Sequence, residues 1–209
     1  MPTAGIILCG GDSRRMGQPK WRLAFGDETM IDRIARVLSG VVDVVIVVGP
    51  AVGAMPRPAG VGPTIKLARD RVGDRGPLEG VAVGLAVAEE AGCRLSFITA
   101  CDTPLVRPAF IRRLLQQAVG HDAAVVRTAA GDHPLPAVYA ATLLDELEAA
   151  LARGERRAGA LAALGRTRWI SGEELRDDDP ELASLVNLNT PAEYAAALRR
   201  LEPNAAAPH

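Results

Sequence analysis

The apolar run Val44-Val45-Ile46-Val47-Val48 is the feature that most constrains the fold of this chain. Its β-branched residues leave no polar face, which is typical of a strand buried on both sides in a parallel sheet. Similar runs occur at 5–8, 95–99 and 123–126, and stretches with apolar residues at helical spacing lie between them. We therefore predict an α/β fold, Rossmann-like and three-layered, with a mostly parallel sheet and helices on both faces.

Composition and charge limit the class of protein. Apolar residues make up 48% of the 209 residues and charged residues 23%, which is typical of a globular chain with a sizeable core. The net charge of −1 gives no broad field for nucleic acid or membrane, so any anion site has to be local. With no membrane-length apolar run and no signal segment, we expect a cytoplasmic protein. Cys9, Cys93 and Cys101 lack metal-type spacing and are expected to be reduced and buried.

The segment after the first apolar run favours an anion as ligand. The run ends at Gly10-Gly11, and Arg14, Arg15 and Lys20 follow without helical periodicity. Glycines let backbone N–H groups approach an anion closely, and three cations suit a triphosphate. The alternative is a solvated loop with chance basic residues. The phosphate loop of the NTPases is excluded, because it needs Gly-Lys followed by Ser or Thr, whereas Lys20 follows Pro19 and precedes Trp21. The dinucleotide fingerprint is excluded because the Gly10-Gly11 spacing does not fit it.

Acidic residues stand where two further predicted strands end. Asp70 follows a weaker strand at 65–68, and Asp102 follows the strand at 95–99. Ligands of such sheets bind beyond the carboxyl ends of the strands, so Gly10, Asp70 and Asp102 are expected to converge there. A carboxylate in Asp102's position suits Mg²⁺, which takes one or two carboxylates together with substrate phosphates. The alternative is that Asp102 only forms a turn.

The second half of the chain gives weaker local signals. We predict a turn at 131–136 before a short strand at 137–139, a helix at 143–152 and another helix to Leu164. A short strand at 168–170 precedes a solvated loop at 172–180, and Asn187 and Asn189 alternate along a further short strand. The last helix has clear start signals, with Thr190 as N-cap, Pro191 at the first position and Glu193 three residues after the cap.

Six motifs in order resemble the molybdenum cofactor guanylyltransferases over nearly the whole chain. They are Gly10-Gly11 with Arg14-Arg15-Met16-Gly17 and Lys20, Gly76-Pro77-Leu78-Glu79-Gly80, Cys101-Asp102-Thr103-Pro104, His133-Pro134-Leu135-Pro136-Ala137, Gly154-Glu155-Arg156-Arg157 and Asn187-Leu188-Asn189-Thr190-Pro191. The chain departs from the family at Val48-Gly49-Pro50, where an Asn often stands, and at Cys9, where Ala is usual and which we interpret as a small apolar filler.

The resemblance implies a fold like that of the nucleotide-diphospho-sugar transferases. It also implies one domain over residues 1–201, with a nucleotide half at about 1–105, an acceptor half at about 106–201 and a disordered tail at 202–209. The implied nucleotide site consists of Leu8, Cys9, Gly10, Gly11, Lys20, Asp70, Gly80 and Asp102. Catalysis would fall to Lys20, Asp102, Arg14 and Arg15, with Mg²⁺ on Asp102. The implied acceptor site consists of His133, Arg156, Arg157, Asn187 and Asn189.

The implied reaction transfers GMP from GTP to the phosphate of molybdenum-molybdopterin and releases pyrophosphate. GTP and molybdenum-molybdopterin are then the partners, with other cofactor-biosynthesis proteins and apo-molybdoenzymes as further candidates. Two alternatives stay open: a cytidylyltransferase that uses CTP, and a nucleotide-binding regulator without turnover. The downstream residues also have structural readings, since His133 can cap a turn and Arg156 and Arg157 can be a solvated pair near a helix end.

Overall fold

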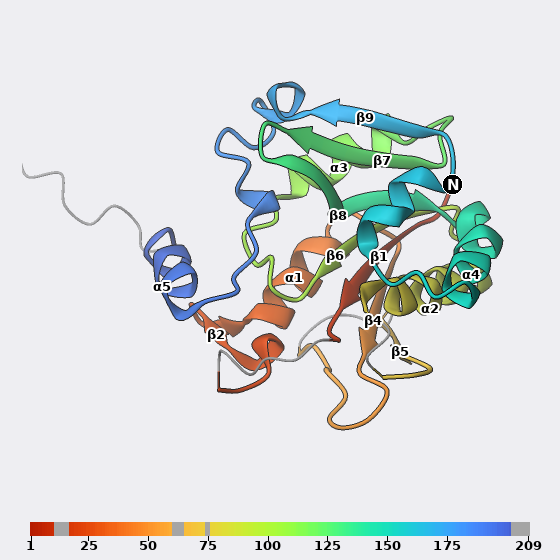
Figure 1. The fold of residues 1–209 in the computed structure, drawn as a ribbon. Helices are drawn as coiled ribbons and strands as arrows, with labels where there is room; N and C mark the ends of the chain where they lie inside the picture. Colours follow the sequence, from red (N-terminus) through yellow and green to blue (C-terminus); the bar gives the residue numbers. More distant parts are fainter. Residues whose placement is uncertain (11–16, 60–64, 74–75, 202–209) are drawn as a thin grey trace, which may run out of the picture.

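A seven-stranded sheet runs through the computed structural model, which describes residues 1–10, 17–59, 65–73 and 76–201 (Figure 1). The strand order is β5-β4-β1-β6-β8-β7-β9. Only β8 runs antiparallel to its neighbours in the described sheet, so the prediction of a mostly parallel α/β fold is confirmed. The strands are β1 (Thr3–Leu8), β4 (Val44–Gly49), β5 (Ile65–Arg69), β6 (Leu95–Ala100), β7 (Ala123–Thr128), β8 (Gly131–Ala140) and β9 (Thr167–Ser171).

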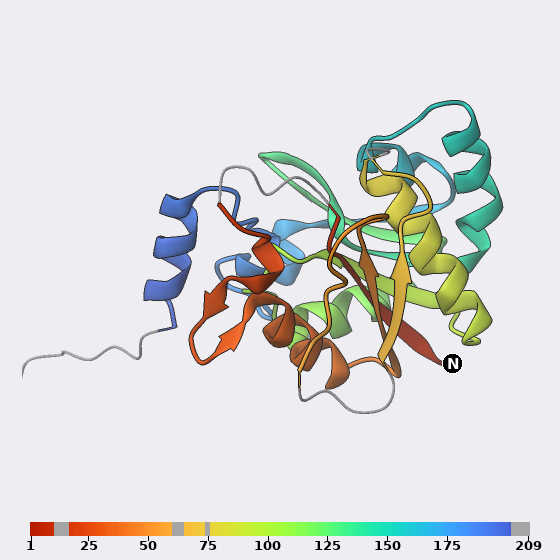
Figure 2. The same ribbon diagram turned by 90° about the horizontal axis from the view of Figure 1, so that it is seen from below.

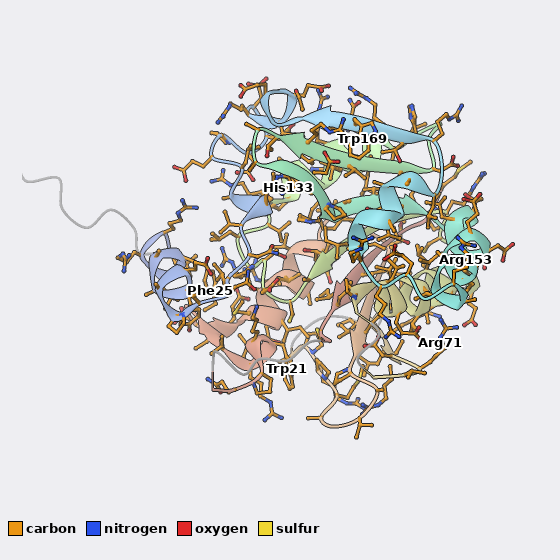
Figure 3. All side chains as sticks on the ribbon, viewed as in Figure 1. Trp21, Phe25, Arg71, His133, Arg153 and Trp169 are labelled. Carbon is orange, nitrogen blue, oxygen red and sulfur yellow. The ribbon has the colours of Figure 1, made fainter. Side chains whose placement is uncertain are left out.

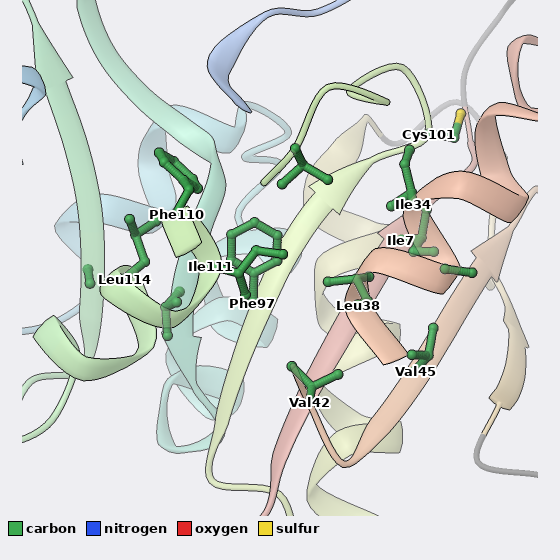
Figure 4. Packing of buried hydrophobic residues seen from close by; sticks show 14 of the residues in the cluster. Ile7, Ile34, Leu38, Val42, Val45, Phe97, Cys101, Phe110, Ile111 and Leu114 are labelled. Atoms are coloured by element: carbon green, nitrogen blue, oxygen red, sulfur yellow. The ribbon is translucent and has the colours of Figure 1, made fainter. Parts of the chain in front are cut away.

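Helices cover both faces of the sheet, because side chains of the buried strands alternate between two cores. Ile7 points into a core with α1 (Met30–Ser39) and α3 (Pro108–Gln117), whereas Ile6 points into a core with α2 (Pro77–Glu90) and α4 (Leu144–Ala152). Figure 4 shows the first core, where side chains of α1 and α3 meet Phe97 of β6. In the part of the chain that the structure describes, no helix is long and apolar enough to cross a membrane.

A third, smaller core joins the two ends of the chain. The hairpin of β2 (Ala24–Phe25) and β3 (Glu28–Thr29) packs beside α5 (Pro191–Arg199), as Figures 1 and 2 show. Phe25 and Leu188 are buried in this core. The predicted start of α5 is confirmed, since the side chain of Thr190 accepts from the backbone N–H of Glu193 and that of Glu193 accepts from the cap backbone. The early and late segments of the chain are thereby held together.

The predicted turn at 131–136 is wrong, because β8 already begins at Gly131. The strand pairs with β7 at residues 131–133 and again from Val138, with a bulge between these two stretches. Pro134 and Pro136 fall inside the bulge, where no ladder hydrogen bond requires their missing N–H groups. Pairing with β6 begins only at Ala137. The prolines therefore mark an irregular stretch of strand and not a turn.

Three other local predictions need correction. The expected helix to Leu164 is a 3-10 turn at Ala158–Ala163, in keeping with the low helix propensity of Gly159. The expected solvated loop at 172–180 contains a 3-10 turn at Gly172–Leu175 and the fully buried Asp179. Asn187 and Asn189 do alternate in exposure with the buried Leu188, but they form no strand. The helix at Leu144–Ala152 and the strand at 168–170 are confirmed.

Candidate active site

A cavity of about 620 Å³ opens at the carboxyl ends of β1 and β6. This is the edge of the sheet at which the strand-end rule places ligands. Trp21, labelled in Figure 3, forms part of its wall. Lys20 and Trp21 are supplied by the 3-10 turn Lys20–Arg22. The described lining consists of Leu8, Cys9, Gly10, Gly17, Gln18, Pro19, Lys20, Trp21, Pro50, Val52, Ala54, Ala100, Cys101 and Asp102.

Lys20 and Asp102 form an ion pair inside this cavity. The Lys20 Nζ lies 2.7 Å from Asp102 Oδ2 and 2.7 Å from the side-chain carbonyl oxygen of Asn189. The Lys20 and Asp102 side chains are only 17% and 13% exposed, so the pair is shielded from bulk water. Asp102 Oδ1 is buried without a hydrogen-bond partner among the described residues. The pair therefore combines a held ammonium group with a carboxylate oxygen that remains available to a ligand.

The segment before α5 places Asn189 at this ion pair. The backbone N–H of Leu188 donates to the carbonyl oxygen of Asp102 at 2.8 Å, and that of Asn189 donates to Glu193 Oε2 at 2.7 Å. The latter bond, with the side-chain bond from Thr190, lowers the pKa of Glu193. Asn189 is thus fixed on both sides, by the loop after β6 and by the cap of α5.

Asp70 lies on the other side of Gly10, at the end of β5. A Cβ at Gly10 would come within 2.9 Å of Asp70 Oδ2, and one at Gly80 within 3.2 Å of Oδ1. Asp70 Oδ1 is buried without a hydrogen-bond partner in the described residues. Burial, with a smaller contribution from the nearby Glu79 carboxylate, raises the pKa of Asp70 to about 6. The two glycines therefore leave room for a carboxylate whose Oδ1 has no partner among the described residues.

An ion pair between the half-exposed Arg71 and the buried Glu79 lies next to Asp70 and was not anticipated from the sequence. Glu79 of α2 is 2% exposed and accepts from Arg71 Nε at 2.8 Å. Arg71, labelled in Figure 3, also reaches Glu148 of α4 at 2.9 Å. The only sequence signal was the charge of Glu79 on an otherwise apolar helix start. Arg71 consequently ties the loop after β5 to both helices on that face.

The predicted acceptor residues do not all meet in the cavity that Lys20 lines. Arg156 and Arg157 line a second cavity of about 620 Å³, together with Arg153, which Figure 3 labels. This loop packs on the start of α2, because a Cβ at Gly76 would come within 2.6 Å of the Arg156 carbonyl oxygen. Asn187 is exposed on the segment that carries Asn189. The second cavity therefore adjoins the helix that carries Gly80.

His133 stands at the irregular start of β8. Its Nε2 lies 2.9 Å from the Thr128 hydroxyl. Burial lowers the pKa of His133, although the neighbouring Asp132 carboxylate acts in the opposite direction. Since β8 is antiparallel to β6, this start lies toward the carboxyl ends of the parallel strands. His133 is therefore on the same edge of the sheet as Asp102.

Part of the predicted nucleotide site cannot be located in the structure. Gly11, Arg14 and Arg15 lie outside the described residues. The chain differs from the family pattern at Val48-Gly49-Pro50, and the segment that begins there forms part of the cavity wall, since Pro50, Val52 and Ala54 line the cavity. We did not predict from the sequence that Pro50, Val52, Ala54 and Trp21 line the cavity. The first three follow a strand end and Trp21 follows Lys20, so both positions were usable signals.

All three cysteines are free and buried, as predicted. Burial raises the pKa of Cys9 well above its ordinary value, with a further contribution from the neighbouring Cys101. A thiol this weakly acidic stays protonated at neutral pH. Cys9 therefore fits the expectation of a small filler in the cavity floor better than that of a reactive thiol.

Comparison with known proteins identifies the class. Molybdopterin-guanine dinucleotide biosynthesis protein A from Archaeoglobus fulgidus superposes with a TM-score of 0.75 at 23% identity, covering 95% of this chain and 98% of the other. A Mycobacterium tuberculosis protein solved in complex with manganese superposes with a TM-score of 0.61 at 19% identity, covering 95% and 99%. The fold shared with them is that of the nucleotide-diphospho-sugar transferases, and the match to an NTP transferase domain defines the class as nucleotidyltransferase.

The family follows from sequence similarity. The model of the MobA-like NTP transferase domain matches residues 5–168. The molybdenum cofactor guanylyltransferase of Desulfosudis oleivorans is 36% identical over 198 residues, covering 93% of this chain and 94% of the relative. The chain belongs to the MobA-like NTP transferase family, so the resemblance found in its motifs is confirmed.

Proposed function

We propose that this nucleotidyltransferase acts in molybdenum cofactor biosynthesis and transfers GMP from GTP to the phosphate of molybdenum-molybdopterin. The products are the guanine dinucleotide form of the cofactor and pyrophosphate. The observation that carries the proposal is the shielded Lys20–Asp102 pair in a strand-end cavity. The names of the relatives support the choice of acceptor.

Catalysis in this proposal consists of positioning and charge stabilisation. The attacking phosphate is already ionised at neutral pH, so in-line attack on the α-phosphorus needs no general base. Lys20 and either Arg14 or Arg15 stabilise the departing pyrophosphate, together with N–H groups of the Gly10-Gly11 turn. His133, Arg156, Arg157, Asn187 and Asn189 hold the acceptor. The second cavity, with its three arginines, suits an anionic part of that molecule.

The chemistry of Asp102 fits a divalent cation, which we take to be Mg²⁺. Its Oδ1 is buried and unpartnered among the described residues, and the nucleotide would supply phosphate oxygens as further ligands. The manganese-bound structural neighbour supports a divalent ion. When bound, the ion would neutralise negative charge on the reacting phosphates.

The choice of GTP rests on the donors of its base. Guanine presents adjacent N1–H and N2–H donors, which one carboxylate or two carbonyl groups can accept together. Asp70 offers a buried acceptor oxygen without a partner in the described residues, either for these donors or for the ribose. Carbonyl groups near Leu8 and in the Pro77–Gly80 turn are the backbone candidates. Cytosine has one exocyclic amine beside acceptors, so a site built for guanine would leave acceptors unpaired.

Calorimetric titration with GTP and CTP in the presence of Mg²⁺, together with pyrophosphate release on adding molybdopterin, tests this proposal. We expect GTP to bind tighter by a factor on the order of 10² or more and to support turnover. Equal affinity for CTP would favour the cytidylyltransferase. Nucleotide binding without pyrophosphate release would favour the regulator.

A further inference from the structure

The position of Lys20 bears on how a cation reaches Asp102. Its ammonium group lies 2.7 Å from both Asp102 Oδ2 and Asn189 Oδ1, and its side chain is largely buried. Asp102 is the one carboxylate among the described residues that line the cavity. A lysine ammonium and a divalent cation prefer the same oxygen ligands, so they compete for this carboxylate. The remaining oxygen, Oδ1, is next to a charge that already neutralises the group.

Two like-charged ions on one shielded carboxylate repel each other. At an effective dielectric constant of about 20, unit charges 4 Å apart interact by several times the thermal energy, and a divalent ion doubles that term. Asn189 adds a second acceptor for the ammonium group and so opposes its movement away. A triphosphate changes the balance, because it offers the ammonium group several negative oxygens and brings cation ligands of its own.

We propose that Lys20, held by Asn189 on Asp102 Oδ2, keeps a divalent cation off the neighbouring Oδ1 in the nucleotide-free protein and moves away when a nucleoside triphosphate binds. A divalent cation then binds together with the nucleotide and not before it. This inference rests on the proposed function only for the identity of the ligands. By linkage, the nucleotide tightens cation binding by the same factor by which the cation tightens nucleotide binding. Lys20 thereby prevents a cation from filling the site without its substrate.

The test measures Mn²⁺ binding to the protein without nucleotide, with free Mn²⁺ determined by its paramagnetic resonance signal. Lys20→Met should tighten Mn²⁺ binding by a factor on the order of ten or more relative to wild type. Arg22→Met is the matched control, since it removes the same charge from the same 3-10 turn. Arg22 stacks on the ring of Trp21 at 4.6 Å instead of reaching Asp102. We expect it to leave Mn²⁺ binding within about two-fold of wild type.

A neutral substitution separates this idea from a general effect of charge. Asn189→Ala removes one acceptor of the ammonium group and should tighten Mn²⁺ binding about three-fold, because Lys20 is then held less firmly. Asn187→Ala, which alters an exposed amide on the same segment, should not change it. Adding Asp102→Asn to Lys20→Met should abolish the gain.

Three results would overturn the proposal. They are equal Mn²⁺ affinity of wild type and Lys20→Met, undetectable binding in both, or a gain that persists without the Asp102 carboxylate. Should Lys20→Met fail to fold, unchanged Mn²⁺ affinity in Asn189→Ala has the same meaning. None of these measurements involves GTP or turnover, so failure here leaves the guanylyl-transfer proposal standing, and failure of that proposal leaves this one intact.

Discussion

Asp70 shows how a residue proposed for the nucleotide site can destabilise the protein that carries it. Its raised pKa means that, between about pH 4 and pH 6, the folded protein binds a proton more readily than the unfolded chain does. The free energy of unfolding therefore decreases as the pH rises through this window, and the ionised carboxylate destabilises the folded protein at neutral pH. A ligand that donates hydrogen bonds to Asp70 would offset that destabilisation.

Asp70→Asn should raise the free energy of unfolding of the nucleotide-free protein at pH 7.5 by about 1 kcal/mol, after allowance for solvent screening of this partly exposed group. The gain should largely vanish toward pH 4, where the carboxyl of the folded wild-type protein is protonated and carries no charge. Urea unfolding at both pH values checks this, with the exposed Asp27→Asn as control. A gain of equal size at both pH values would mean that the charge of Asp70 is not its cause.

Asp102→Asn should lower guanylyl transfer by a factor on the order of 10² or more while the protein stays folded. The substitution removes the charge at a strand end without opening a cavity, so we expect a loss in stability of no more than about 2 kcal/mol. Pyrophosphate release and thermal unfolding followed by circular dichroism measure the two effects. Wild-type turnover at limiting Mg²⁺ would exclude Asp102 as the metal ligand.

At the scale of an element, the loop before α5 depends on a buried carboxylate. Asp179 is fully buried, and its two oxygens accept from the backbone N–H groups of Ala183 and Ser184 at 3.0 and 2.7 Å. Arg107, at the start of α3, lies 3.3 Å from the same carboxylate. Between these groups Leu182 adopts a left-handed backbone conformation, with φ at 50°, which is unfavourable for a leucine. Asp179 stabilises this bend and thus the path of the chain toward Asn189.

Asp179→Asn should destabilise the protein by about 2 kcal/mol, because an amide nitrogen then faces a backbone donor and the partner charge is lost. Asp177→Asn, an exposed neighbour two positions earlier, is the control and should stay within about 0.5 kcal/mol of wild type. Midpoints of urea unfolding measure both. If the two variants unfold alike, the buried carboxylate contributes nothing specific to this loop.

For the whole molecule, the sequence predicted those features that local chemistry determines. β-Branched runs located the inner strands, and strand-end positions indicated that Gly10, Asp70 and Asp102 converge. Pairings between distant residues were not predictable. Lys20 and Asn189 are 169 positions apart, and no local sequence pattern predicts their contact. The interpretation of 172–180 failed for the same reason, because the three aspartates look alike in sequence and only tertiary structure buries Asp179.

Gly76 joins the two predicted halves of the chain through a close backbone contact. It has φ at 70° and faces the Arg156 carbonyl oxygen, so a side chain is excluded by both conformation and space. Gly76→Ala should destabilise the protein by about 2 kcal/mol and displace the loop with Arg156 and Arg157. Gly73→Ala, where a Cβ meets nothing within 4 Å, is the control. Equal urea midpoints for the two variants would argue against a tight contact.

The span between Lys20 and Asn189 has a consequence during synthesis. A ribosome releases the N-terminal strands first, and the last strand of the sheet, β9, ends at Ser171. A nascent chain that has emerged to that point exposes the residues of the described sheet and of the Lys20–Asp102 pair, whereas Asn189 is still inside the ribosome. Asn189 reaches Lys20 only when α5 docks beside the hairpin of β2 and β3. The Lys20–Asp102 pair can therefore form before Asn189 joins it, and a chain interrupted before Asn189 lacks that contact.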